Sequence, residues 1–436
     1  MTRPNHSGLH RILIVGGGAG GLELACRLGR TLGGRMAEVT LVDRNASHLW
    51  KPRLHEVGAG LAGAADDETS YLTLGHRHGF EFCLGELVGW SRNERSIVVD
   101  SVTSALSEDE LLERRIVPYD TLVFALGSRV NDFGISGVRE HCHMLDSTEQ
   151  ALRLQRCFLE AAVKASAGKL ARVRIGIVGA GATGVELAAE FHHAGHTMEL
   201  YGGLGAAGKL DITLIDRSTR VLPAVDPRTS ASAQKALQQR GIKVLLGQQV
   251  SQVSKDGLLL ASGDKLPCDI MVWSSGIVGH PVMTSIGLPT TKGNRVDVDD
   301  CLACAGVPDV YAIGDCAAAP SADGKGVLPP TAQVAHQQAE YLARALKHRI
   351  QGAASPPFVY RPRGTLVSLG AREAAAEFEA PIRQNRVLPA HGAFAKLLYA
   401  MLHHAHRVTL HGAGRATALF FSDRLRRAAF SAVKLH

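Results

Sequence analysis

Apolar and polar positions follow two different periods along the first 50 residues. Arg11–Val15 is an apolar, β-branched run typical of a buried parallel strand. The glycine-rich stretch Gly16–Gly21 follows it, and Leu22–Arg30 has the apolar spacing of a helix. Val39–Asp43 is a second apolar run, and it ends in an acid 25 residues after Gly18. This order of strand, glycine turn, helix, strand and acid predicts a dinucleotide-binding unit.

The same pattern recurs 163 residues later, with a strand at Val173–Val178, a turn at Gly179–Gly184, a helix at Val185–His193 and a strand at Asp211–Asp216. In each turn the first glycine permits a tight bend, the second lets a pyrophosphate approach the backbone, and the third lets the helix pack on the strand. The positive end of the helix then faces the phosphates. One such motif is weak evidence, but two complete copies predict two dinucleotide sites.

Further elements surround these two units. Short alternating segments in Phe80–Pro118 predict a small antiparallel sheet. Three later apolar runs predict strands, at Tyr119–Gly127, Asp269–Gly276 and Val310–Asp315. Prolines end the chain's regular structure before Thr331, and Ala332–Ile350 predicts a helix with Thr331 as its N-cap.

Composition excludes several classes of protein. A length of 436 residues suggests two or three domains, and 45% hydrophobic with 20% charged residues excludes wholesale disorder. The 47 glycines are irregularly spaced, which excludes collagen, and only 5% aromatic residues disfavours a surface that stacks on nucleic acid bases. The eight cysteines are too scattered for a disulfide framework.

The net charge of +7 is concentrated at one end of the chain. From Lys396 onward, seven Lys and Arg residues accompany one acid, so 41 residues carry +6. Between Ala418 and Leu435, helical spacing gathers apolar residues on one side and Arg424, Arg427 and Lys434 opposite, although Phe420 and Arg426 interrupt the pattern. We expect an in-plane membrane anchor; a helix docked on the body or on a partner is the alternative. No apolar run reaches 18 residues, and the first ten residues lack the apolar segment of a signal peptide.

The paired fingerprints, with the Ala312–Cys316 segment Ala-Ile-Gly-Asp-Cys, resemble those of the two-dinucleotide-domain flavoprotein reductases, which have the glutathione-reductase-like fold. The resemblance implies an α/β fold of two Rossmann-like domains, with the NADH domain inserted in the FAD domain. The implied boundaries are 1–165 and 289–370 for the FAD domain, 166–288 for the NADH domain and 371–436 for a membrane-association region.

Three closer matches resemble type II NADH:quinone oxidoreductases, which are single-subunit enzymes that do not pump protons. They are the loop His48–Gly60, the fingerprint Gly181–Glu190 with its glutamate, and Ala332–Gln337, which matches the family pattern AQxAxQ. The resemblance implies FAD-dependent transfer of two electrons from NADH to a membrane quinone. It also implies a peripheral protein, a homodimer, on the cytoplasmic face of the inner (plasma) membrane, with no nucleic acid or metal. The stretch after Gly392 lacks the tryptophans that part of the family has there, so the quinone entrance is left undefined.

The resemblance also implies site residues. Those implied for non-covalent FAD are Gly16, Gly17, Gly18, Ala19, Gly20, Gly21, Asp43, Arg44, Lys51, Val88, Gly127, Asp315, Ala332, Gln333 and Lys396. Those implied for NADH are Gly179, Gly181, Thr183, Gly184, Glu186, Asp216 and Gly276. The implied catalytic residues are Glu186, Gln333 and Gln337.

Each role has a physical basis and a plainer alternative. Gln333 and Gln337 share one helix face and can bind quinone carbonyls, or they are merely polar packing positions. Glu186 positions a substrate or transfers a proton, or it is an ordinary acid in a first helical turn. Asp216 is expected to bind ribose hydroxyls and repel a 2′-phosphate, which favours NADH, although the adjacent Arg217 weakens that inference.

Two rival functions remain open. A sulfide:quinone oxidoreductase needs redox-active cysteines, for which Cys142, Cys157 and Cys316 are candidates, but it does not need the second fingerprint. A flavoprotein of the apoptosis-inducing-factor type does not need the quinone motif. Cys301 and Cys304 have CxxC spacing without a second pair, so we expect buried thiols there and not a metal.

Overall fold

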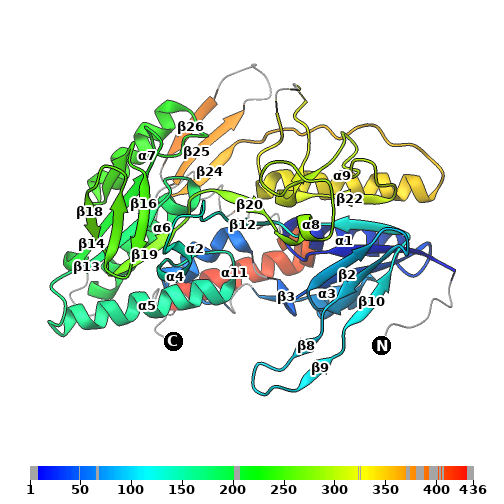
Figure 1. Cartoon of the computed structure of the whole chain (residues 1–436), viewed down its shortest axis with the longest axis horizontal. Helices are drawn as coiled ribbons and strands as arrows, with labels where there is room; N and C mark the ends of the chain where they lie inside the picture. The colour runs from blue at the N-terminus through cyan, green and yellow to red at the C-terminus, as the bar shows by residue number, and fades with distance from the viewer. Residues whose placement is uncertain are drawn as a thin grey trace. The chain divides into compact units, whose positions relative to one another are not determined.

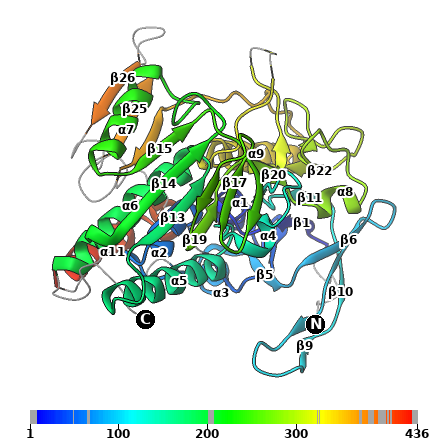
Figure 2. The same cartoon turned by 60° about the vertical axis from the view of Figure 1, so that its left-hand side comes forward.

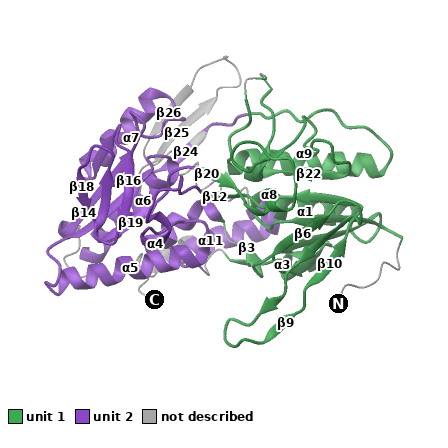
Figure 3. Cartoon of the chain, in the orientation of Figure 1, with its two compact units in different colours: residues 1–50, 68–129, 277–361 green, residues 51–67, 130–276, 362–436 purple. Residues whose placement is uncertain are grey.

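A computed structural model of the chain describes residues 8–48, 50–64, 68–200, 207–322, 324, 326–369, 374–379, 387–391, 401, 404 and 407–429. The chain divides into two compact units (Figure 3). Unit 1 contains residues 1–50, 68–129 and 277–361, and unit 2 contains residues 51–67, 130–276 and 362–436. Each unit has its own parallel sheet, as the repeated sequence pattern predicts.

The sheet of unit 1 has five parallel strands in the order β22-β11-β1-β2-β5. They are β1 (His10–Val15), β2 (Ala37–Asp43), β5 (Glu81–Leu84), β11 (Thr121–Phe124) and β22 (Val310–Ala312). Figure 1 labels two of them, β2 and β22. β1 lies at the centre, and its last four side chains are at most 1% exposed. A strand covered on both faces needs apolar side chains at every position, which explains the continuous apolar run in the sequence.

Helices and smaller sheets complete unit 1. Its helices are α1 (Ala19–Leu32), α3 (Tyr71–His78), α8 (Val282–Ser285), α9 (Ala332–Ile350) and the 3₁₀ turn η4 (Gly314–Cys316). A three-stranded antiparallel sheet contains β6 (Leu87–Ser91), β7 (Ser96–Val99) and β10 (Arg115–Pro118). Strand pairs are β3 (Ser47–His48) with β4 (Thr69–Ser70), β8 (Val102–Thr103) with β9 (Glu110–Leu112), and β21 (Val296–Asp297) with β23 (Ala317–Ala318). Figure 2 shows the β8–β9 hairpin extending away from the parallel sheet of its unit.

Unit 2 repeats the arrangement with four parallel strands in the order β15-β14-β13-β19. They are β13 (Val173–Val178), β14 (Leu210–Asp216), β15 (Lys243–Leu246) and β19 (Ile270–Trp273). Two antiparallel sheets contain β16 (Val250–Ser254), β17 (Gly257–Leu260) and β18 (Lys265–Pro267), and β24 (Thr365–Ser368), β25 (Ala374–Glu379) and β26 (Val387–His391). Its helices are η1 (Lys51–Arg53), α2 (Leu54–Gly58), α4 (Val138–His141), α5 (Thr148–Ser166), α6 (Ala182–Leu200), η3 (Ala207–Lys209), α7 (Pro227–Gln239) and α11 (Ala413–Ala429). The short strands β12 (Ser128–Val130) and β20 (Ile277–Gly279) lie where the chain passes between the units.

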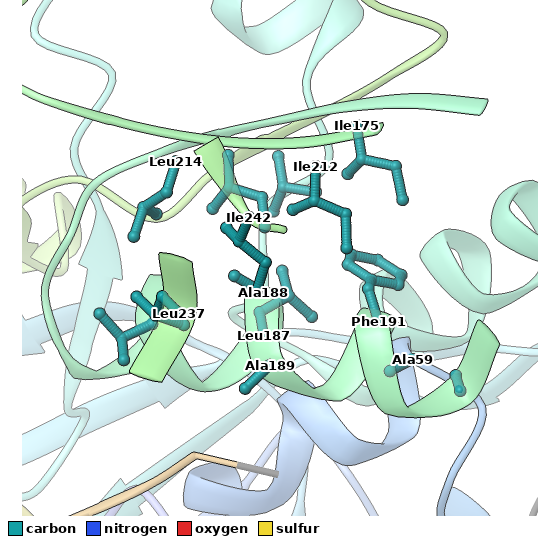
Figure 4. Close-up of a cluster of buried hydrophobic side chains, with 14 of the residues drawn as sticks. Ala59, Ile175, Leu187, Ala188, Ala189, Phe191, Ile212, Leu214, Leu237 and Ile242 are labelled. Carbon is teal, nitrogen blue, oxygen red and sulfur yellow. The ribbon is translucent and has the colours of Figure 1, made fainter. Parts of the chain in front are cut away.

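The largest apolar cluster of unit 2 lies around α6. Phe191 of α6 is fully buried with Ile175 and Ile212 of the sheet and Ala59, which follows α2 (Figure 4). Phe158 of α5 also joins it, with its ring centre 4.8 Å from that of Phe191. Burying each large apolar side chain contributes about 1.5–3 kcal/mol, so this cluster holds α2, α5 and α6 on one sheet.

The compact units begin and end at other residues than the predicted domain boundaries. Residues 51–67 and 130–165, assigned from the sequence to the first part of the FAD domain, belong to unit 2. The reason is the apolar cluster around α6, in which α5 and the segment after α2 bury their side chains.

One predicted sheet differs in the structure. Phe80–Pro118 was predicted to contain a small antiparallel sheet, but its first strand, β5, pairs parallel with β2 and belongs to the main sheet. The rest of the segment forms the antiparallel sheet of β6, β7 and β10. Alternation shows that a strand is half-buried, but not which strand will pair with it.

The C-terminal helix α11 is described over Ala413–Ala429, which covers the first part of the helix that the sequence predicts between Ala418 and Leu435. Val433, Lys434 and Leu435 lie outside the described residues. Among the helices that the structure describes, none combines the length and the apolar character required to span a bilayer.

Candidate active site

The glycine turn of unit 1 is shaped by backbone contacts at two of its glycines. Gly16 has φ +108°, and a Cβ there would lie 2.4 Å from the Ala125 carbonyl oxygen. A Cβ on Gly21 would lie 1.9 Å from the Gly16 carbonyl oxygen, so helix and strand approach only with glycine. A Cβ on Gly18 would meet nothing within 4 Å. The turn therefore leaves open space beside Gly18, as the approach of a pyrophosphate requires.

Asp43 braces this turn from the end of β2. Its Oδ2 accepts the Gly17 N–H at 2.6 Å, and its Oδ1 accepts the Asn45 N–H at 2.8 Å. The Gly17 carbonyl accepts from the Tyr71 hydroxyl at 2.8 Å and from Nδ1–H of His48 at 2.9 Å. A carboxylate has about four lone-pair sites, so Asp43 keeps capacity for ribose hydroxyls.

The turn of unit 2 has nearly the same geometry. Gly179 has φ +114°, a Cβ on Gly184 would lie 1.8 Å from the Gly179 carbonyl oxygen, and a Cβ on Gly181 would meet nothing within 4 Å. Asp216 Oδ2 accepts the Ala180 N–H at 2.6 Å. Two separate segments of sequence thus build the same arrangement, one in each unit. We call it an acid-braced cradle: a glycine turn with open space at its second glycine and an aspartate that accepts a backbone N–H of the turn.

Arg217, which follows Asp216, lies to one side of this cradle. Its guanidinium carbon is 5.7 Å from the centre of the Phe133 ring, close enough for a cation–π contact. Phe133 also lies against Gly276, where a Cβ would be 2.4 Å from its Cζ atom. The side chain that weakened the NADH inference from sequence is therefore placed over an aromatic ring of the same unit.

Asp315 lies directly after β22 in unit 1. The Ser128 hydroxyl donates to its Oδ2 at 2.8 Å, and Arg295 Nε–H donates to its carbonyl at 3.1 Å. Gly127 next to Ser128 has φ +68°, and the equivalent Gly276 of unit 2 has φ +69°. These bonds hold the Asp315 carboxylate beside the closing turn, where the resemblance predicts a flavin contact.

Helix α9 begins as predicted, with the Thr331 side chain accepting the Val334 N–H at 3.3 Å. The side-chain amide oxygen of Gln333, Oε1, accepts a hydrogen bond from the Tyr360 hydroxyl at 2.6 Å. Gln337 is buried, and its amide both donates to the Arg361 carbonyl at 2.8 Å and accepts the Arg361 N–H at 3.0 Å. The two glutamines therefore have different surroundings, and the contacts of Gln337 are those of a residue that secures the following segment.

Sequence analysis missed the polar residues that tie α9 to its unit. Glu23 of α1 is 1% exposed, and its carboxylate pairs with Arg27 and with His336, in both cases at 2.7 Å. Gln338 accepts the Gly314 N–H at 2.7 Å. An acid on the apolar face of a predicted helix was the available signal for Glu23.

Glu186 is buried in the second turn of α6. Its Oε1 accepts the Ser368 N–H at 2.9 Å, and its Oε2 lies 3.4 Å from His55 Nδ1. Burial raises the pKa of the Glu186 carboxyl to about 8, and the nearby Glu190 carboxylate adds to the rise. Glu186 is therefore mainly protonated at neutral pH, unlike an ordinary acid exposed in a first helical turn.

His55 of α2 is the partner of Glu186 that sequence analysis missed. It is 3% exposed, and burial lowers the pKa of its ring to about 4. The ring is neutral at pH 7, so Nδ1 can accept the proton that Glu186 donates. Its Nε2 atom has no hydrogen-bond partner within the described residues.

The remaining predicted residues lie at the edges of the two units. Ala19 and Ala332 begin helices α1 and α9, and Gly20 is buried in α1. In unit 1, Arg44 pairs with Glu86 at 3.7 Å, and Val88 on β6 is 41% exposed. In unit 2, Lys51 and Thr183 are exposed. Lys396 lies outside the described residues.

The cysteines are buried or partly buried, and of the pair expected to be buried thiols only Cys304 is fully so, whereas Cys301 is partly buried. Burial raises the pKa of Cys316 to about 11 and that of Cys142 to about 12, and it also raises the pKa of Cys157. None of the three is a thiolate at neutral pH, which is the reactive form. Cys304 is buried, and Cys301 lies with Asp299 and Asp300 in a group whose ligand atoms are within 4.8 Å of one another. The two acids are exposed, and Asp299 already accepts the N–H groups of Cys301 and Ala303.

Comparison with known proteins assigns the family. Residues 10–339 match the pyridine nucleotide-disulphide oxidoreductase family. The chain is 36% identical to a type II NADH:quinone oxidoreductase of Haemophilus influenzae, over 98% of this chain and 100% of that protein. The chain belongs to the type II NADH:quinone oxidoreductase family. A type II NADH:quinone oxidoreductase of Mycobacterium tuberculosis is 28% identical, over 91% of this chain and 83% of that protein.

Solved structures show the fold. NDH2 of Plasmodium falciparum in complex with NADH has a TM-score of 0.82 at 19% identity, covering 98% of this chain and 100% of that one. The sulfide:quinone oxidoreductase of Aquifex aeolicus has a TM-score of 0.73 at 18% identity, covering 98% and 96%. The predicted family and fold class are confirmed, and at these identities neither structure by itself distinguishes type II oxidoreductases from sulfide:quinone oxidoreductases.

Proposed function

We propose that this chain transfers two electrons from NADH to a quinone, with FAD as its bound cofactor. The observation that carries the proposal is the pair of acid-braced glycine turns, in a chain 36% identical to a type II NADH:quinone oxidoreductase. Two cradles serve two dinucleotides, FAD in unit 1 and NADH in unit 2. The test is to purify the protein, identify its bound flavin and measure NADH oxidation with menaquinone and ubiquinone analogues.

The residues of unit 1 suit FAD. The open space beside Gly18 accommodates a pyrophosphate near the start of α1, where free N–H groups favour negative charge. Asp43 has acceptor capacity for the adenosine ribose, and Asp315 for the flavin side chain. The chemistry that bound FAD supplies is reversible two-electron redox, which no side chain offers.

The residues of unit 2 suit NADH. The open space beside Gly181 and the start of α6 form the second pyrophosphate cradle, and Asp216 lies at the end of β14, where the ribose of a dinucleotide binds in this fold. A 2′-phosphate would place two further negative charges beside the Asp216 carboxylate, so the site favours NADH over NADPH. Thr183 and Gly276 complete the predicted site.

Quinone reduction also needs a proton. NADH, one proton and quinone give NAD⁺ and quinol, so one proton must come from the solvent. Glu186 is the group that can hold it, because its carboxyl is protonated near neutral pH and its position is set by Ser368 and His55. Glu186 thus combines the two roles inferred from sequence, positioning and proton transfer.

Replacement of Glu186 by Gln should remove a step in the pH profile. In the native enzyme the quinone half-reaction should slow as the pH rises through about 8, where Glu186 loses its proton. The variant keeps the shape of the side chain but has no transferable proton, so its rate should be about 10²-fold lower and independent of pH in that range. Stopped-flow measurement of the half-reaction from pH 6 to pH 9 checks this. A native profile that is flat through pH 8 would contradict the assignment.

Stability provides an independent control on the same residue. The folded pKa of Glu186 lies above its ordinary value of 4.5, so the folded state binds more protons than the unfolded state between pH 4.5 and about 8. The contribution of this group to the free energy of unfolding therefore falls as the pH rises through that window. Denaturant titrations should show that decline in the native chain and a smaller one in the Glu186→Gln variant.

Gln333 belongs to the quinone half-reaction in this proposal. Gln333→Leu should slow the reaction with quinone by about tenfold while leaving anaerobic reduction by NADH nearly unchanged, because the quinone loses a hydrogen-bond partner. The Tyr360 hydroxyl loses its acceptor too, so flavin content is measured beside the rates. Gln337→Leu is the matched comparison: it removes both contacts with Arg361 and should affect both half-reactions. If Gln333→Leu slows the NADH and quinone half-reactions equally, Gln333 helps to hold the flavin and does not bind the quinone.

The C-terminal helix is proposed as the membrane contact. Along α11, Leu419, Phe421 and Leu425 are 39%, 58% and 72% exposed, an unusual density of large apolar side chains on one helix. The Asp423 carboxylate pairs with Arg407 at 2.5 Å, which neutralises the helix's one acid. This supports a peripheral protein on an anionic lipid surface, the cytoplasmic face of the inner membrane, where its quinone is dissolved; the homodimer remains a family-level expectation.

The rival functions make different demands. A sulfide:quinone oxidoreductase needs reactive cysteines, and the raised pKa values of Cys142, Cys157 and Cys316 disfavour that role. Loss of flavin absorbance with NADH but not with sulfide excludes it. Steady turnover with a quinone excludes a flavoprotein of the apoptosis-inducing-factor type, in which NADH oxidation serves a binding role.

A further inference from the structure

The last two turns of α6 carry three side chains of metal-binding types on one face. His192, His196 and Glu199 stand at positions i, i+4 and i+7, which align along one side of an α-helix. They line a cavity of about 390 Å³ together with Leu210, Arg240 and Ile242. Leu210 is the first residue of β14, so the cavity lies at the amino end of that strand. The Asp216 cradle lies at the carboxyl end, about 20 Å away along the strand.

The two histidine rings are placed for a shared ligand. Their centres are 4.7 Å apart and their planes are inclined by 63°. A zinc ion 2.0–2.1 Å from one nitrogen of each ring, at tetrahedral angles, places the ring centres about 5 Å apart. Neither ring makes a hydrogen bond to any residue that the structure describes. Two adjacent imidazoles without such partners indicate a ligand that both can bind.

The site is open to solvent. His196 and Glu199 are exposed, so a metal ion can reach the site from solvent.

One residue opposes a cation there. Arg240 lines the same cavity, and its Nη1–H donates to the Ala236 carbonyl at 2.6 Å. This bond holds the guanidinium near the end of α7, but its charge still lowers the affinity for a cation. Glu199, which lines the same cavity, contributes the opposite charge.

We propose that His192 and His196 bind a divalent late transition-metal ion at a site separate from the nucleotide site of unit 2. Glu199 lines the same cavity and supplies a negative charge that favours a cation. Two imidazoles suit Zn²⁺, Ni²⁺ and Cu²⁺, and they do not suit Mg²⁺, which prefers oxygen ligands. The sequence raised metal binding only at the Cys301–Cys304 pair, and it did not predict this site.

The test uses the oxidised FAD-loaded enzyme without a polyhistidine tag and without NADH. Equilibrium dialysis against Zn²⁺ should show one more bound ion per chain in the native enzyme than in the His192→Asn/His196→Asn double variant. The difference between the two proteins measures this site, because any zinc bound elsewhere is common to both. Glu199→Gln should weaken binding at this site several-fold, whereas Arg240→Met should tighten it.

Controls separate the site from general effects. His193→Asn changes a histidine of the same helix outside the proposed ligand set, and it should leave the stoichiometry unchanged. Mg²⁺ should show no difference between the native enzyme and the double variant. Flavin content and the thermal melting temperature report folding, and if the double variant does not fold, the exposed His196→Asn single variant replaces it. Equal zinc stoichiometry in the native enzyme and a folded variant would overturn the proposal.

Discussion

A variant lacking residues 416–436 should lose most of its activity with quinone dissolved in a membrane, yet keep its FAD and still reduce a water-soluble quinone. The deletion removes four basic residues, Arg424, Arg426, Arg427 and Lys434, against one acid, and it removes the exposed apolar side chains of α11. Each basic residue near an anionic surface contributes about 1 kcal/mol, so vesicle binding should weaken by about 10²-fold from charge alone. Vesicle sedimentation and activity with both quinones measure the effect.

Two narrower variants separate charge from apolar burial. The triple change Arg424→Gln/Arg426→Gln/Arg427→Gln should make binding less dependent on salt, because ions screen only the electrostatic part. Phe421→Ser/Leu425→Ser should leave the dependence on salt and weaken binding at every salt concentration. Salt should release only part of the native protein from vesicles. If the truncated chain binds anionic vesicles as tightly as the native one, the tail packs on the body or on a partner instead.

Substitution of Asp216 by Asn should shift the preference between NADH and NADPH by about tenfold or more, measured as the ratio of kcat/KM values. The change removes the negative charge that repels a 2′-phosphate. It keeps a carbonyl oxygen that can accept the Ala180 N–H, so the glycine turn is retained. Asp216→Ala should shift the ratio in the same direction and also weaken NADH binding, because the turn loses its brace.

Two comparisons make this test specific. Arg217→Met should change the ratio less than Asp216→Asn does, because Arg217 lies over the Phe133 ring. Flavin content should be unaffected in all three variants, since the proposed FAD cradle is in unit 1. An unchanged ratio in both Asp216 variants would show that another residue recognises the ribose.

Local pattern was enough to predict the parallel sheets and their turns. β13 and α9 have the predicted limits, and both glycine turns have the predicted geometry, because short-range spacing and glycine's freedom at positive φ are properties of neighbouring residues. The roles assigned to Asp43 and Asp216 come from the same kind of pattern, since an acid at a strand end beside a glycine turn meets backbone N–H groups of that turn.

The local sequence pattern could not predict which distant segments of the chain pack together. The parallel pairing of β5 with β2, and the inclusion of α5 and residues 51–67 in unit 2, depend on which apolar faces cover one another. Alternation and helical spacing state that a face is apolar but carry no information about its partner. The predicted domain boundaries therefore followed the motifs and not the packing.

The sequence by itself determined the fold, the two glycine turns with their acids and the family, because those rest on glycines, acids and apolar runs at fixed local spacing. Only the tertiary structure decided that burial raises the pKa of Glu186 and that Gln337 secures Arg361. Glu186 meets Ser368 across 182 residues of sequence, and its pKa is raised because the fold removes water from around it. Burial belongs to the packed chain as a whole, so no local pattern could have shown it.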